Sequence, residues 1–323
     1  MDIRKCEKSE ISELSSFLSN SNYFPYRYLS AKRNNLINYW KSDIEKRVEK
    51  GSELYLIFSK NNIKGFTLFE DLPWDSKIFD KKMGCLTHLT FIEDIDFQES
   101  KKFVDFAVSV AREKGYEFLL CKSNTDNISA VHSLEKNGFY LVDTLLDFVW
   151  DRKTNPLEFS MLSNEKIFIE EAKLSDEDEL RHIARKAFSK HFGRYHSDPN
   201  IPKEKANSVY EEWVSSCLRG YADHFFVAKV EGKLAGYSIW KKESELEKEF
   251  DLGLGHYSIA GVNEEFRGMG LFKLLTIAGM KELEKEVDMI EGPTHINNYP
   301  VQRGYAGLGW KIGDARHSFH KWI

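Results

Sequence analysis

The feature that most constrains this chain is an internal repeat with a constant spacing of 171 residues. Residues 54–69 and 225–240 both have the pattern of a strand, a tight turn and a second strand. The same spacing joins Gly65 with Gly236, Asn127 with Asn298, Gly138 with Gly309, and Phe148 with Phe319. One offset held over most of each half indicates a single fold that is present twice.

The length agrees with two domains, because 323 residues exceed the ~250–300 residues that one hydrophobic core usually serves. A polar run with a proline, Arg152–Pro156, marks the boundary, so we expect domains at 1–153 and 154–323. Each half alternates strand and helix patterns around a hairpin. This order predicts an α/β (α+β) fold, with a mixed, largely antiparallel sheet flanked by helices in each domain.

Composition excludes several classes of protein. The net charge is −5 and the charges are interspersed, which argues against nucleic acid as a partner. The first residues lack an apolar signal core, and no apolar run approaches the ~18 residues of a membrane helix. We therefore expect a cytoplasmic protein without membrane insertion. The four cysteines are scattered, which predicts reduced thiols and no metal site. A homodimer is left open.

In the second half, an apolar strand at Tyr257–Val262 leads into a loop that ends in Arg267-Gly268-Met269-Gly270. An amphipathic helix follows from Leu271. Glycines before a helix let backbone N–H groups converge on an anion, and the helix dipole adds to the attraction. Arg267 can add a charge-assisted hydrogen bond. The arrangement predicts a phosphate-binding loop.

This loop resembles motif A of the GNAT superfamily of acyl-CoA N-acyltransferases, with Phe272 in place of the last small residue. The resemblance implies an acyl-CoA cosubstrate, acetyl-CoA or 3-hydroxybutanoyl-CoA, and no metal. The residues expected to bind it are Gly261, Val262, Arg267, Gly268, Met269, Gly270, Leu271, Phe272 and Asn298. Backbone N–H groups of the strand at 259–262 are expected to stabilise the oxyanion.

A second signature follows the next strand. Asn298, Val301, Tyr305, Gly309 and Trp310 are in register with the GNAT pattern Asn-x-x-Ala-x-x-x-Tyr-x-x-x-Gly-Phe. The resemblance implies that Asn298 contacts the cofactor and that Tyr305 protonates the departing sulfur. A phenol with a pKa near ~10 is protonated at neutral pH and suits that role. For the base we consider His256, His295 and Glu291, with a water chain to solvent as the alternative.

The first half lacks these features. Residues 171 positions before Arg267, Gly268 and Gly270 are Asp96, Phe97 and Glu99, and the counterpart of Tyr305 is Leu134. An acidic loop without glycine repels a pyrophosphate. We therefore expect one acyl-CoA site, in the second half.

The acceptor is indicated by two looser resemblances to dTDP-fucosamine acetyltransferases, at Leu72–Phe79 and between Ala187 and Val214. Aromatic and arginine side chains in a loop can stack a base and pair with a diphosphate. The candidates are Phe192, Arg194, Tyr195 and His196. The resemblance implies acyl transfer to the C3 or C4 amine of a dTDP-linked amino-dideoxyhexose, for surface polysaccharide such as O-antigen, lipopolysaccharide or capsule. The alternatives are a GNAT that acts on another small-molecule or peptide amine, and a non-catalytic CoA-binding protein.

Overall fold

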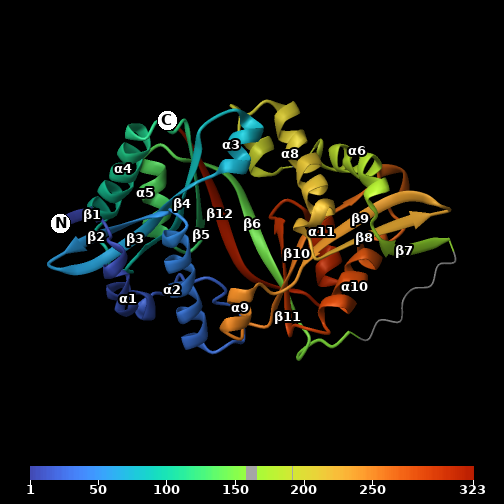
Figure 1. Cartoon of the computed structure of the whole chain (residues 1–323), viewed down its shortest axis with the longest axis horizontal. Helices are drawn as coiled ribbons and strands as arrows, with labels where there is room; N and C mark the ends of the chain where they lie inside the picture. Colours follow the sequence, from blue (N-terminus) through green and yellow to red (C-terminus); the bar gives the residue numbers. More distant parts are fainter. Residues whose placement is uncertain (158–165, 191) are drawn as a thin grey trace. The chain divides into compact units, whose positions relative to one another are not determined.

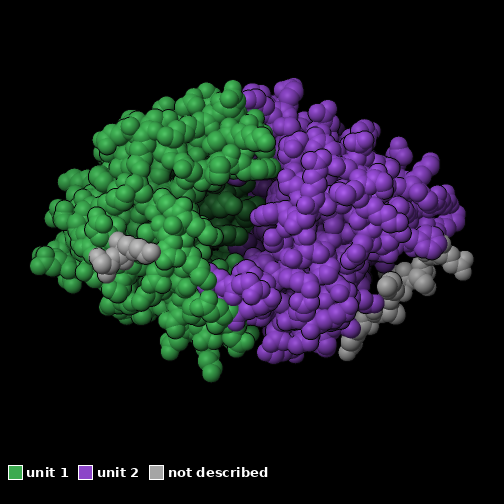
Figure 2. All heavy atoms as spheres, viewed as in Figure 1, with its two compact units in different colours: residues 1–145, 249–252, 314–323 green, residues 146–248, 253–313 purple. Residues whose placement is uncertain are grey.

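The computed structural model describes residues 1–157, 166–190 and 192–323, and it divides into two compact units (Figures 1 and 2). Unit 1 comprises Met1–Leu145, Glu249–Leu252 and Asp314–Ile323, and unit 2 comprises Leu146–Lys248 and Gly253–Gly313. None of the described helices is long and apolar enough to cross a membrane.

The first half of the chain supplies six strands and five α-helices in the described residues. They are β1 (Asp2–Lys5), η1 (Lys8–Glu13), α1 (Leu14–Asn20), α2 (Arg33–Glu49), β2 (Glu53–Ser59), β3 (Asn62–Asp71), α3 (Pro73–Phe79), β4 (Met83–Phe91), α4 (Phe97–Glu113), β5 (Phe118–Asn124), α5 (Ile128–Lys136) and β6 (Tyr140–Asp151).

The second half repeats this order. Its elements are β7 (Ile167–Glu171), η2 (Leu174–Asp176), α6 (Glu177–Phe188), α7 (Arg194–Ser197), α8 (Lys203–Ser216), η3 (Cys217–Tyr221), β8 (His224–Val230), β9 (Lys233–Lys241), α9 (Glu245–Glu249), β10 (Leu254–Val262), η4 (Glu264–Phe266), α10 (Leu271–Leu283), β11 (Met289–His295), α11 (Tyr299–Ala306) and β12 (Lys311–Trp322). The offset of 171 maps β4 onto β10, β5 onto β11 and β6 onto β12 residue for residue. The predicted repeat is therefore present in the structure.

Each unit is a mixed sheet flanked by helices, so the predicted fold class is confirmed. In unit 1, β1 to β4 pair antiparallel in sequence order, and β4 pairs with β5 in parallel. In unit 2, β7 to β10 pair antiparallel, and β10 pairs with β11 in parallel. Helices cover both faces of each sheet (Figure 1).

The core of unit 1 lies on both faces of its sheet. Phe66 on β3 packs its ring 5.6 Å from Phe17 of α1 and 5.5 Å from Trp40 of α2. On the opposite face, Phe91 of β4 packs 5.8 Å from Phe103 of α4. Alternating side chains of a strand point to opposite faces, which lets one sheet hold two helical layers.

The two units exchange their last strands. From Asp314 onward β12 belongs to unit 1, where it pairs antiparallel with β5 from Arg316↔Asn124 to Trp322↔Phe118. From Leu146 onward β6 belongs to unit 2, where it neighbours β11. The compact units therefore differ from the predicted contiguous domains 1–153 and 154–323, because each half provides the strand that completes the sheet of the other.

A half-buried arginine, Arg27, fixes the exchanged strand in unit 1. The Arg27 guanidinium donates to both carboxylate oxygens of Asp314 at 2.8 and 2.9 Å, and it also binds Asp126. The Asn124 amide donates to Asp314 at 2.9 Å. Bidentate arginine–carboxylate pairs are directional, so this contact specifies the register of β12 as well as its attachment.

The exchange is testable with a matched pair of substitutions, Phe148→Ala and Phe319→Ala. These residues are repeat partners, but Phe148 packs in the core of unit 2 and Phe319 in the core of unit 1. Loss of a buried phenylalanine costs ~3–5 kcal/mol. Hydrogen exchange followed by mass spectrometry should show faster exchange of unit 2 peptides for Phe148→Ala and of unit 1 peptides for Phe319→Ala. The opposite assignment would contradict the exchange.

Candidate active site

The loop between β10 and α10 has the backbone that a bound anion needs. Gly268 and Gly270 have φ angles of +84° and +76°, a region that glycine adopts without strain. Among the described residues, no atom lies within 4 Å of the place where a Cβ would stand at either glycine. The Asn263 side chain accepts a hydrogen bond from the N–H of Glu265 and fixes the start of the loop. The loop is thus open to a ligand on its backbone side.

The first turns of α10 and of α4 differ in how their N–H groups are satisfied. In α4, the Asp96 carboxylate accepts from the N–H groups of Gln98 and Glu99 at 2.8 and 3.3 Å. In α10 the N-cap is Gly270, which has no side chain to cap with. The glycine loop also delays the start of α10 to Leu271, three residues after the position equivalent to Phe97 in α4. The first N–H groups of α10 could therefore donate to an anion, whereas those of α4 donate to the Asp96 carboxylate of the same helix.

Strands β10 and β11 separate at the site. Their parallel pairing runs from Leu254↔Met289 to His256↔Glu291, although β10 continues to Val262 and β11 to His295. A bulge between Tyr257 and Ile259 interrupts the pairing of β10 with β9, and Pro293 in β11 has no N–H to donate. Backbone groups beyond the point of separation can pair with an extended ligand instead of a strand.

Tyr305 on α11 lies beside these strands. Its side chain is buried, with its ring 4.7 Å from Trp310 and 5.8 Å from Tyr257. Burial, with a smaller contribution from Tyr257, raises the pKa of Tyr305 well above its usual range, so the phenol is protonated at neutral pH. No hydrogen bond to the Tyr305 hydroxyl comes from any residue that the structure describes. The hydroxyl is therefore available as a donor.

Two glycines make room for this tyrosine and for the unusual Phe272. A Cβ at Gly292 on β11 would stand 2.6 Å from the Tyr305 hydroxyl oxygen. A Cβ at Gly304 on α11 would stand 2.6 Å from the Phe272 ring. The departure of Phe272 from motif A is thus matched by a glycine on the neighbouring helix. Sequence reasoning missed both glycines, although a glycine inside a strand or helix is itself a signal of close approach.

Asn298 and its repeat partner Asn127 have different partners. In unit 1, the Asn127 amide donates to the Leu89 carbonyl on β4 at 3.3 Å, and its oxygen caps α5 at Ala130. In unit 2, the Asn298 amide donates to the Thr294 hydroxyl at 3.1 Å and its side chain does not cap α11. In unit 1 this asparagine thus joins α5 to β4. In unit 2 the Asn298 amide binds Thr294 instead of the carbonyl of Ala260, the counterpart of Leu89 on β10.

His256 is held between two carboxylates. Its Nδ1 lies 2.9 Å from Glu291 on β11, and its Nε2 lies 3.1 Å from Glu247 on α9. Burial by itself lowers the pKa of His256, but hydrogen bonds and charges from Glu247 and Glu291 outweigh it and raise the pKa to about 10. An imidazole that is already protonated at neutral pH cannot accept a proton there. The two carboxylates thus hold His256 as a cation beside Glu291, and its role as a base stays a prediction.

His295 is the last residue of β11 and is buried. Its carbonyl accepts hydrogen bonds from the Asn298 N–H and the Gln302 amide, both at 2.9 Å. These bonds fix the turn that leads from β11 into α11. Its role as a base stays a prediction.

The four residues predicted to bind the acceptor lie at α7. Tyr195 is buried, with the Arg194 guanidinium 4.1 Å from the centre of its ring. The His196 Nε2 lies 2.8 Å from the Asn207 side-chain oxygen on α8, and its ring stacks on Tyr210. His196 thus serves the packing of α7 against α8, and Tyr195 is buried beside Arg194. Phe192 alone of the four is strongly exposed, with 57% of its surface accessible.

Comparison with known proteins agrees with the fold. No family model matches the chain. The spore coat polysaccharide biosynthesis protein SpsD of Bacillus subtilis (strain 168) is 23% identical over 269 residues, which cover 82% of this chain and 86% of SpsD.

Two solved structures match almost the whole chain. A GCN5-related N-acetyltransferase from Sphaerobacter thermophilus has a TM-score of 0.65 at 13% identity, covering 99% of this chain and 95% of that chain. A tandem GNAT protein from the clavulanic acid biosynthesis pathway has a TM-score of 0.58 at 11% identity, covering 99% of this chain and 98% of that chain. The chain therefore has the GNAT acetyltransferase fold in tandem.

The charge state of His256 is testable by NMR titration of its imidazole. We expect a pKa of about 10 in the folded protein, and a lower value in Glu247→Gln. Because this pKa exceeds the ~6.5 of an unfolded chain, its stabilising effect is complete below pH ~6.5 and disappears as the pH rises through the folded value. The free energy of unfolding in urea should therefore fall more between pH 7 and 10 in the wild type than in His256→Gln. A folded pKa near that of free histidine would contradict the ion-pair assignment.

Proposed function

We propose that unit 2 binds an acyl-CoA and transfers its acyl group to an amine. The observation that carries the proposal is the N-terminus of α10, which follows Gly268 and Gly270 and has no side-chain cap. Backbone N–H groups at such a helix end can bind a pyrophosphate, whereas in unit 1 the Asp96 carboxylate caps the corresponding helix. Arg267 stands at the start of this turn and would add a charge-assisted contact.

The separated strands and the following helix would hold the rest of the cosubstrate. Backbone groups of Gly261 and Val262 would pair with the extended arm of the acyl-CoA, and Asn298 would contact it from the start of α11. Met269, Leu271 and Phe272 would line the way from the loop to the strands. N–H groups of residues 259–262 on the side away from β9 would donate hydrogen bonds to the oxyanion and so stabilise its charge.

The reaction is a direct transfer. The acceptor nitrogen attacks the thioester carbonyl, a C–N bond forms and the C–S bond breaks. The thiolate takes a proton from the Tyr305 hydroxyl, and the proton that the new amide nitrogen loses restores the phenol. The acceptor arrives as an ammonium and must lose a proton before it attacks. Since His256 is held protonated, Glu291 is the candidate base, and its carboxylate is oriented by the His256 imidazolium at 2.9 Å.

For the acceptor we propose the amine of a dTDP-linked amino-dideoxyhexose, a building block of surface polysaccharide. The reaction would take place in the cytoplasm. The similarity to a spore coat polysaccharide biosynthesis protein supports a sugar acceptor. Phe192 is exposed and could stack a nucleobase, with Arg194 beside it for a phosphate. The acyl group would be acetyl or 3-hydroxybutanoyl.

The acceptor is tested by mixing the protein with acetyl-CoA or 3-hydroxybutanoyl-CoA and a panel of amines, and by following free thiol. The panel contains dTDP-3-amino and dTDP-4-amino sugars, free amino sugars and a peptide N-terminus. We expect thiol release with a dTDP-amino sugar. Thiol release only with another amine would identify that amine, and not a dTDP-amino sugar, as the acceptor. CoA binding without thiol release for any amine would favour the alternative of a non-catalytic CoA-binding protein.

Tyr305→Phe should lower kcat by ~10²–10⁴-fold, the usual contribution of a positioned acid, with little change in affinity for acyl-CoA. The matched control is Tyr257→Phe, because Tyr257 is also buried beside the site but its hydroxyl lies near Thr276. Steady-state thiol release gives kcat, and calorimetry gives the affinity. Wild-type kcat in Tyr305→Phe would remove Tyr305 from the reaction.

Gly270→Asp should place a carboxylate at the N-cap of α10, the position that Asp96 occupies in α4. Aspartate and asparagine both tolerate a positive φ, so Gly270→Asn is the control for backbone strain. We expect the Kd for CoA to rise at least ~10-fold more in Gly270→Asp than in Gly270→Asn, because the carboxylate competes for the N–H groups and repels the pyrophosphate. Equal affinities in the calorimeter would place the phosphates elsewhere.

A further inference from the structure

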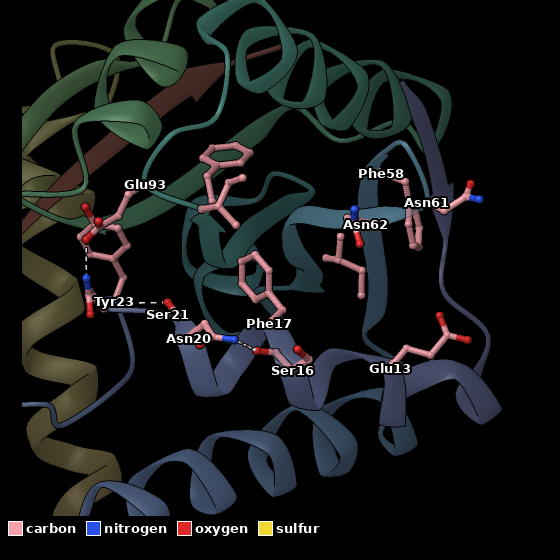
Figure 3. Close-up of a pocket in the computed structure, with 14 residues that line it drawn as sticks. Glu13, Ser16, Phe17, Asn20, Ser21, Tyr23, Phe58, Asn61, Asn62 and Glu93 are labelled. Carbon is pink, nitrogen blue, oxygen red and sulfur yellow. Dashed lines mark hydrogen bonds between the residues drawn. The ribbon is translucent and has the colours of Figure 1, made fainter.

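Unit 1 has a pocket of its own, and none of its lining residues is among those proposed for acyl transfer. It has a volume of about 470 Å³ and lies between α1, the turn that joins β2 to β3, and the end of β4. Figure 3 shows Glu93, Tyr23 and Asn20 on one side and Asn62 and Phe58 on the other, with the Phe17 ring between them. This volume falls in the ~300–1,000 Å³ range of small-molecule sites.

The lining combines polar and aromatic groups. Asparagine amides both donate and accept hydrogen bonds, and the carboxylates of Glu13 and Glu93 accept them. Tyr23 and Phe58 supply half-exposed aromatic surface, and the buried Phe17 ring lies between them. A ligand that fits must therefore carry several hydroxyl groups and also a C–H face that can lie against a ring.

The charge of the pocket excludes phosphates. Its lining residues include two glutamates, and none of those that the structure describes is a lysine, arginine or histidine. Arg4 stacks over the Phe58 ring at 4.9 Å, but its guanidinium is paired with Glu10 at 2.7 Å. Two further guanidinium groups adjoin the lining, but Arg27 is paired with Asp126 and Asp314, and Arg33 donates to the Ser21 carbonyl at 2.7 Å. A phosphate in this place would therefore meet the carboxylates at short range, with no cation among the lining residues that the structure describes.

Contacts from the segment after α1 hold one wall in place. The Asn22 amide donates to the Glu93 carboxylate, and the Tyr23 hydroxyl donates to the Asp126 carbonyl at 3.3 Å. Asn22 and Tyr23 are thereby bound to the ends of two neighbouring strands of unit 1, β4 and β5. A wall that is already ordered loses less entropy when a ligand binds.

We propose that this pocket binds a saccharide that carries no phosphate, and binds an amino sugar best. Sugar hydroxyls match the amides and carboxylates, a pyranose C–H face matches the aromatic rings, and an ammonium on the sugar is attracted by Glu93 and Glu13. Neither the nucleotide of an activated sugar nor CoA fits the charge. The site is thus separate from the acyl transfer proposed for unit 2.

Saturation-transfer NMR with the full chain tests the proposal, using glucosamine, glucose and glucose 6-phosphate as probes. We expect affinity to fall in that order. Asn62→Ala should weaken glucosamine binding about fivefold, the effect of one lost hydrogen bond, while Asn34→Ala on the surface of α2 should leave it unchanged. Glu93→Gln should remove the preference for glucosamine and ease the penalty on glucose 6-phosphate.

Three results would overturn the proposal: no signal from any of the sugars, wild-type affinity in Asn62→Ala, or glucose 6-phosphate binding as tightly as glucose. CoA binding, measured on the same samples by calorimetry, shows whether unit 2 is intact and decides the proposed acyltransferase separately. Loss of saccharide binding with normal CoA binding concerns the pocket alone.

Discussion

The first N–H groups of a helix must find acceptors, and the two units meet this need in opposite ways. In α4 the Asp96 carboxylate accepts from Gln98 and Glu99, so the helix end is complete without a ligand. In α10 the cap is Gly270, which has no side chain to provide an acceptor. A single local choice, carboxylate or glycine, thus decides which copy of one fold can hold an anion, and the position of the proposed reaction follows from it.

The packing around Tyr305 depends on that same helix. Phe272, in the first turn of α10, packs over Gly304 and lies 5.6 Å from the Tyr305 ring, while Gly292 leaves room for the hydroxyl. The loop and the phenol are therefore parts of one aromatic cluster. A change at the start of α10 would reach Tyr305 through Phe272.

Much of the fold was predictable from the sequence, because the offset of 171 follows from glycines and aromatics at turns and core positions that tolerate few replacements. The loop was predictable for the same reason, since Gly268 and Gly270 are needed for a positive φ. The environment of His256 was not, because Glu247 comes from a short helix whose position is set only by tertiary packing. The packing role of His196 was hidden similarly, since an aromatic loop sequence does not show which ring faces a neighbouring helix.

The exchange of β6 and β12 was also invisible in the sequence, since a repeat shows what each half contains but not which half uses it. It has a consequence for the newly made chain on the ribosome. Asp314–Ile323 is synthesised after every other segment of unit 1, so unit 1 must wait for it with the edge of β5 open. At ~5–20 residues per second this delay is on the order of ten seconds. The half that is made first is therefore finished last.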